Sequence, residues 1–109
     1  MIRPGASFKD NLQALPPIDG LARIELSNAA GELVATIVNE PGKQGSLAVY
    51  NYLYQQFGLL DQAAAQLGLD IFAEHTADAK NRPGAHPNID RLFAVLEKGE
   101  TLEIAVIAA

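Results

Sequence analysis

The sequence contains no cysteine and no tryptophan, and only one of its 109 residues is methionine. Without cysteine there is no disulfide framework, no thiolate zinc site, no iron–sulfur cluster and no cysteine nucleophile. Residues 1–8 lack the apolar region of a secretory signal. The longest wholly apolar run, residues 104–109, is far shorter than the roughly 20 residues that a membrane-spanning helix needs. We therefore expect a cytoplasmic protein that does not enter a membrane.

Positive charge is also scarce. Eight Lys and Arg residues stand against 13 Asp and Glu residues, which gives a net charge of −5. Nucleic acids and anionic membrane surfaces are bound mainly through many basic side chains, so this balance argues against both as partners. The apolar fraction of 49% is ordinary for a folded protein and too high for a disordered one. The length predicts one compact domain over residues 1–109.

Three segments have the pattern of β-strands. Residues 21–27 alternate between apolar and polar side chains, which is typical of a half-buried strand. The following loop contains Gly31, which can take a positive φ, and therefore predicts an N-terminal β-hairpin. The return strand, residues 33–38, is apolar on both faces, which predicts a central strand covered on both sides. Residues 102–107 alternate again and predict a C-terminal strand.

Helical periodicity predicts three to four helices in the rest of the chain. A short first helix has Ser7 as its cap, and a helix over residues 47–57 has Ser46 as its cap. The next apolar stripe ends at Gly68, a residue suited to the left-handed position after a helix, and Asp70 begins a further helix. We therefore predict an α+β fold in which helices pack on a small sheet of about three strands.

The stretch from residue 44 to residue 60 has no charged side chain. A helix that is apolar around most of its circumference lies either at the centre of a domain or against another subunit. Interfaces are rich in tyrosine and poor in charge, and the exposed edge of a small sheet is a second reason for pairing, so we expect a homodimer. The alternative is core packing, with hydroxyl groups at the rim. The candidate interface residues are the aromatic ones: Tyr50, Tyr52, Tyr54 and Phe57.

Both histidines lie among carboxylates. The spacing of Glu74, His75 and Asp78 places them near one face of a helix, and His86 follows in a loop that is able to fold back. Imidazoles and carboxylates suit zinc or a similar ion, and a carboxylate next to a histidine suits acid–base chemistry. The alternative is a structural role for all four residues. No HxH or HExxH spacing is present, so we predict no resident metal or cofactor.

The loop over residues 42–46, with the sequence GKQGS, precedes a predicted helix. Free N–H groups at the start of a helix attract anions, so Lys43, Gly45 and Ser46 form a candidate anion or phosphate site. The order of the residues matches neither a P-loop nor a dinucleotide-binding motif. The alternative is a simple turn followed by a helix cap.

A loop with two prolines and a glycine, residues 81–88, connects the last two predicted helices. Its chemistry predicts a rigid turn in which Asn88 caps the last helix and Arg82 pairs with an acidic residue. Residues 73–79 (AEHTADA) and 83–92 (PGAHPNIDRL) resemble a bacterial family of small proteins of unknown function. The resemblance extends over nearly the whole chain and implies a stand-alone bacterial protein, without assigning a catalytic residue.

These observations favour a self-associating binding or interaction module over an enzyme. Two alternatives stay open. One is a metal-dependent or acid–base site at the histidines, and the other is anion binding at the GKQGS loop.

Overall fold

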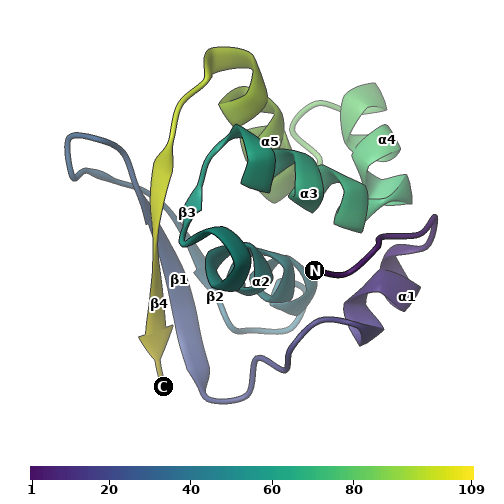
Figure 1. Ribbon diagram of the computed structural model, residues 1–109, viewed down its shortest axis with the longest axis horizontal. Helices are drawn as coiled ribbons and strands as arrows, with labels where there is room; N and C mark the ends of the chain where they lie inside the picture. Colours follow the sequence, from purple (N-terminus) through teal and green to yellow (C-terminus); the bar gives the residue numbers. More distant parts are fainter.

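The computed structural model describes all residues, 1–109. Its elements follow in the order α1 (Phe8–Gln13), β1 (Leu21–Ser27), β2 (Leu33–Val38), α2 (Gln44–Phe57), β3 (Leu59–Leu60), α3 (Gln62–Phe72), α4 (Glu74–Asn81), α5 (Pro87–Lys98) and β4 (Leu102–Ala108). The helices lie together on one side of a four-stranded sheet (Figure 1). The predicted α+β class is confirmed, with one strand more than expected. None of the five helices has the length and apolar character that crossing a membrane requires.

The sheet is antiparallel throughout and has the order β2-β1-β4-β3. The predicted hairpin forms β1 and β2, with Gly31 in the left-handed region at φ 82°. The side-chain oxygen of Asn28 accepts hydrogen bonds from two N–H groups of the turn. On the inner face Ile24 pairs with Ile37 on one side and with Val106 on the other. The alternating apolar residues therefore form one buried layer under the helices.

The prediction that residues 33–38 form a central strand is wrong. β2 lies at the edge of the sheet, because β4 returns along the other side of β1. Leu33, Val34 and Val38 are 58%, 49% and 39% exposed, whereas Ile37 is buried. The helices cover only one face of this strand, so an apolar pattern on both faces does not mean that both faces are covered.

The long uncharged helix α2 lies at the centre of the domain. It begins at Gln44, earlier than predicted, so Lys43 rather than Ser46 occupies the cap position. Six consecutive or nearly consecutive positions on it are buried: Leu47, Val49, Tyr50, Asn51, Tyr52 and Leu53. A single chain therefore encloses most of the helix surface for which a second subunit had been expected.

Gly68 does not end a helix as predicted, because α3 continues through it to Phe72. A β-carbon at this position would lie 2.8 Å from Cδ1 of Leu92 and 3.1 Å from Cδ1 of Leu53. The glycine therefore allows close packing of α2 and α5 against α3. Asp70 does not begin a new helix either; the break comes later, at Ala73, whose φ is 52°.

The N-terminal segment is bound to the helices by polar groups. The predicted cap of α1 is confirmed, since the hydroxyl of Ser7 accepts a hydrogen bond from the N–H of Asp10. The buried amide of Asn11 donates to the carbonyl oxygens of Gly5 and Ile71. These contacts hold α1 against the end of α3, where it forms one wall of the cleft described below.

Candidate functional site

A cleft of about 590 Å³ opens where the start of α2 faces the start of α4 and the α4–α5 connection. The GKQGS loop, residues 42–46, contributes one wall. His75 and His86 line the same cleft. The structure thus brings together two candidate sites that are about 30 to 40 residues apart in the sequence and that the sequence alone does not connect.

Asp78 fixes the position of His86. Nε2 of His86 lies 2.6 Å from Oδ2 of Asp78, and Arg82 donates to both oxygens of the same carboxylate. The predicted pairing of Arg82 with an acid is confirmed. Hydrogen bonds from the Arg82 guanidinium and then from His86 hold the pKa of Asp78 well below its usual range, and the carboxylate raises the pKa of Arg82.

Nδ1 of His86 is the atom of the His86–Asp78 pair that is free to bind a ligand. An ionised carboxylate only accepts hydrogen bonds, so the proton between His86 and Asp78 belongs to Nε2. Nδ1 makes no hydrogen bond within the chain, and no unpaired side-chain nitrogen or oxygen is buried in the structure. Nδ1 therefore remains accessible to a ligand. When neutral it accepts a proton or a hydrogen bond, and when protonated it donates one.

Aromatic rings extend the wall of the cleft beside the imidazoles. The ring centroids of His75 and His86 are 5.7 Å apart, and His75 meets the ring of Phe8 edge-on at 5.1 Å. Phe8 in turn stacks on Phe72 at 5.1 Å. Neither phenylalanine is recognisable as a site residue from the sequence, because nothing local in it indicates that α1 lies beside α4.

The carboxylates predicted as metal ligands have other partners. Oε1 of Glu74 accepts a hydrogen bond of 2.7 Å from the N–H of Phe8, at the first turn of α1. Asp78 is engaged by Arg82 and His86. The structure contains no group of three or more histidine, aspartate or glutamate side chains arranged to hold a metal ion.

The start of α2 presents backbone groups to the cleft. The cap position at Lys43 has no side-chain hydrogen bond to the first turn, and the first N–H groups of a helix have no partner within it. Nζ of Lys43 lies 3.0 Å from the carboxylate of Glu40, with both groups exposed. A β-carbon on Gly45 would lie 3.2 Å from the ring of Phe8, so a glycine lets this loop approach the aromatic wall closely.

The tyrosines of α2 are mostly core residues rather than surface residues. Tyr50 is completely buried, and Tyr52 is buried while its hydroxyl accepts a hydrogen bond from the N–H of Ile2. Tyr54 is 40% exposed, and Phe57 is partly buried. Core packing thus accounts for two of the four predicted interface residues. Only Tyr54 and Phe57 keep surface that a second subunit is able to cover.

Asn88 does not cap α5 as predicted. The helix begins at Pro87, with His86 at the cap position and no side-chain cap. Oδ1 of Asn88 instead accepts a hydrogen bond from Arg91. The turn is stabilised by Asp90, whose side chain accepts from the N–H of Gly84.

A family model matches residues 8–106, which include nearly all of the elements that build the cleft. The chain belongs to the DUF2322 family. The family is described as an uncharacterised protein conserved in bacteria, so the predicted resemblance is confirmed. No curated protein and no solved structure matches the chain significantly.

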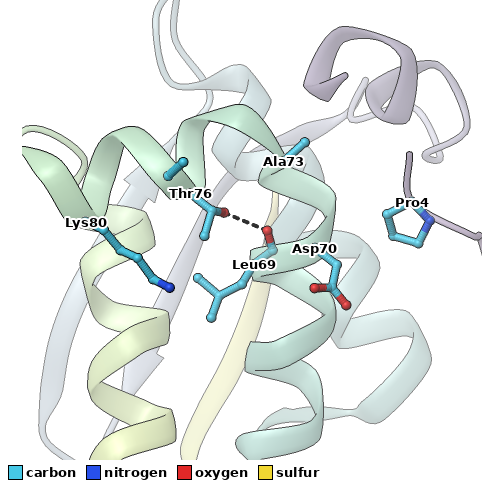
Figure 2. Close-up of a pocket in the computed structure, with 7 residues that line it drawn as sticks. Pro4, Leu69, Asp70, Ala73, Thr76 and Lys80 are labelled. Atoms are coloured by element: carbon cyan, nitrogen blue, oxygen red, sulfur yellow. Dashed lines mark hydrogen bonds between the residues drawn. The ribbon is translucent and has the colours of Figure 1, made fainter. Parts of the chain in front are cut away.

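A second hollow of the DUF2322 chain, about 470 Å³, lies over the junction of α3 and α4 (Figure 2). Pro4, Asp70 and Lys80 lie around it, and Ala73 is at its edge (Figure 2). The hydroxyl of Thr76 donates 2.6 Å to the carbonyl oxygen at the end of α3 and so holds the junction together (Figure 2). This hollow lacks an oriented imidazole, and the histidine cleft is therefore the stronger candidate site.

Proposed function

We propose that this DUF2322 protein is a binding protein for a small anion, and that the anion occupies the cleft between the start of α2 and the two histidines. The observation that carries the proposal is the contact of 2.6 Å between Asp78 and His86, the imidazole that lines this cleft. It fixes one imidazole nitrogen and leaves the other free beside the start of a helix, where the helix dipole favours negative charge.

The protonated imidazole of His86 is the form proposed to bind the anion. Neutral His86 accepts at Nδ1, whereas its protonated form donates from both nitrogens. The carboxylate of Asp78 stabilises the second N–H of that charged form. An anion that accepts from Nδ1 therefore requires the protonated imidazole, and Lys43, which pairs with Glu40, lies at the rim of the cleft.

Inorganic phosphate is the probe of choice, followed by amide and imidazole NMR signals. We expect phosphate to shift the signals of Gly45, Ser46 and His86. The variant His86→Gln should weaken binding about ten-fold, in line with a charged hydrogen bond. Lys80→Gln, on the far side of α4, is the matched control. Unmoved signals, or equal binding by the His86 variant, contradict the proposal.

Acid–base catalysis is the second candidate, since an aspartate that orients a histidine is also the arrangement of a general base. The contact between Asp78 and His86 favours it over a metal site, because the same contact and the contact of Glu74 with α1 occupy the potential ligands. Zinc and manganese distinguish the candidates further. A rise in melting temperature with excess metal that is lost in His86→Gln indicates a metal site instead.

Self-association also stays a proposal, and β2 supports it better than the tyrosines do. Three of the six exposed large hydrophobic residues lie on this edge strand: Leu33, Val34 and Val38. The strand has no charged residue, and an uncharged exposed edge invites pairing with another strand. We therefore infer that two copies pair edge to edge along β2. The cytoplasmic location stays a prediction from the sequence.

Sedimentation velocity tests the pairing of two copies. The variant Thr36→Lys places a charge in the middle of β2, on an exposed position, and should convert a dimer to a monomer. Tyr54→Lys charges the exposed part of α2 and should leave the dimer intact. A monomeric wild type, or a dimer that only Tyr54→Lys disrupts, contradicts pairing along β2.

A further inference from the structure

Arg91 of α5 is held in place by neutral groups alone. Its Nη1 donates to the hydroxyl of Tyr50 at 3.1 Å and to Oδ1 of Asn88 at 2.9 Å. The guanidinium also lies over the ring of Tyr50, with its central carbon 5.6 Å from the ring centroid. Two hydrogen bonds and a cation–π contact fix the position of a group that is otherwise flexible.

No carboxylate lies within ion-pair distance of this charge, although Glu100 lines the same groove. The ion pairs of the structure join acids to Arg23, Lys43, Arg82 and His86, and none includes Arg91. The chain has 13 acidic residues against eight basic ones, so the missing ion pair does not result from a lack of acidic residues. A partly buried and fixed cation without a counter-charge is costly in an empty site, and an anionic ligand would remove that cost.

Arg91 lines a groove of about 620 Å³ that is separate from the histidine cleft. The groove lies between the β1–β2 hairpin and the connection from α5 to β4, and the two sites share no lining residue. Ala30, Val34 and Leu102 provide apolar wall on either side. Val34 is 49% exposed in the chain as it stands, so apolar surface is available next to the charge.

We propose that this groove binds a monocarboxylate with a short apolar chain. Nη1 of Arg91 is already used, which leaves the edge formed by Nε and Nη2 free for the two oxygens of a carboxylate. Arg91 is the only basic residue that lines the groove, and Glu100 lines it too, so a doubly charged phosphate is disfavoured. The apolar chain lies against Val34 and Leu102.

A series of ligands of increasing length tests the class of compound. Acetate, butyrate, hexanoate and inorganic phosphate are titrated while the Nε–H signal of Arg91 and the amide signals of Ala29 and Ala30 are followed by NMR. Burial of two further CH2 groups should tighten binding by about fifteen-fold from butyrate to hexanoate. Phosphate should leave these signals unmoved. Equal affinity along the series, or binding of phosphate here, overturns the proposal.

Two variants test the role of Arg91 itself. Arg91→Lys keeps the positive charge but loses the two parallel N–H donors of the guanidinium, and should weaken hexanoate binding by about ten-fold. Because this change also disturbs Tyr50, the second variant is Ala30→Glu, which adds a negative charge at an exposed turn without touching the contacts of Arg91. It should abolish binding at an unchanged melting temperature.

Matched controls separate this groove from other sites. Arg23→Lys changes an arginine that is paired with Glu25 outside the groove and should leave the affinity for hexanoate unchanged. Lys80→Gln, which changes a residue outside both the groove and the histidine cleft, should also have no effect on hexanoate binding. If Ala30→Glu binds hexanoate as the wild type does, the groove is not the site.

Discussion

The hydroxyl of Tyr50 donates a hydrogen bond of 2.6 Å to the carbonyl oxygen of Asn88 and so ties the centre of α2 to the start of α5. Asn88 lines the histidine cleft, and Arg91, which donates to the same hydroxyl, lines the second groove. One buried tyrosine therefore supports the walls of both proposed sites.

Replacing Tyr50 with phenylalanine should destabilise the protein without emptying the core. The carbonyl oxygen of Asn88 and one N–H of Arg91 lose their partner, which costs about 1–3 kcal/mol when the groups are buried. Urea unfolding measures the change. Tyr54→Phe, at an exposed tyrosine, is the control and should leave the free energy of unfolding within about 0.5 kcal/mol. Equal effects of the two variants contradict the assigned role.

The hydroxyl of Tyr50 should ionise at a higher pH than the hydroxyls of the other two tyrosines. Burial raises the pKa of Tyr50 to about 12, against the opposing effect of Arg91. The folded state thus keeps the proton that the unfolded state loses near pH 10, so the stabilisation is complete below about pH 10 and is lost as the pH rises toward 12. Ultraviolet absorbance should show one of the three tyrosines ionising last, together with unfolding. Early ionisation of all three contradicts this assignment.

Gly68→Ala should destabilise the protein, although alanine is normally the better helix residue. The added carbon would meet Cδ1 of Leu92 at 2.8 Å, and Leu92 is fully buried, so neighbouring groups must move. Overpacking of this kind costs about 1–3 kcal/mol. The double variant Gly68→Ala with Leu92→Ala should lose less stability than the two single variants lose together, because the smaller side chain at position 92 leaves room for the added carbon. Strict additivity in thermal or urea unfolding contradicts the packing role.

Local features of the sequence predict local features of the fold well. The Ser7 cap and the turn at Gly31 depend on neighbouring residues only, and both are confirmed. Gly68 is different, because its local sequence is compatible with two roles. A glycine after an apolar helical stripe can end the helix, or it can lie within the helix and let a neighbouring helix pack closely. The distinction depends on Leu92, which is 24 residues away (92 − 68). Similarly, whether β2 is central or at the edge depends on where β4 returns.

The candidate site shows the same division. The GKQGS loop and the histidines can both be predicted as candidate sites from the sequence. Polar groups at the start of a helix favour anions, and clusters of imidazole and carboxylate suit metal or acid–base chemistry. Their meeting in one cleft depends on the packing of α1, α2 and α4, for which the sequence contains no local signal. The partners of Glu74 and Asp78 also come from this packing and from the α4–α5 loop.

Ala73→Gly should stabilise the protein. Ala73 lies where α3 joins α4 (Figure 2). Its φ of 52° and ψ of −116° are a conformation that glycine adopts more easily than alanine. Relief of the strain should gain about 1 kcal/mol and raise the melting temperature by about 4 °C. Ala77→Gly, inside α4, is the matched control and should cost about 1 kcal/mol. A similar loss in both variants shows that Ala73 is not strained.

Asp78→Asn should loosen His86 and change the acid stability of the protein. The lowered pKa of Asp78 means that the unfolded chain binds its proton first as the pH falls. The stabilisation by Asp78 is therefore complete above about pH 5, and it is lost as the pH falls through and below about 4. The difference in melting temperature between wild type and variant should shrink as the pH falls through and below about 4.

The control for Asp78 is Asp19→Asn, which changes an exposed carboxylate without an ion pair in the structure. It should give no such pH-dependent difference. The imidazole signals provide the second measurement, because His86 loses its carboxylate partner in Asp78→Asn, whereas His75 contacts mainly Phe8 and the His86 ring. NMR should therefore show His86 shifting more than His75. If the two imidazoles respond equally, Asp78 does not orient His86, and the proposed anion site loses the contact on which it rests.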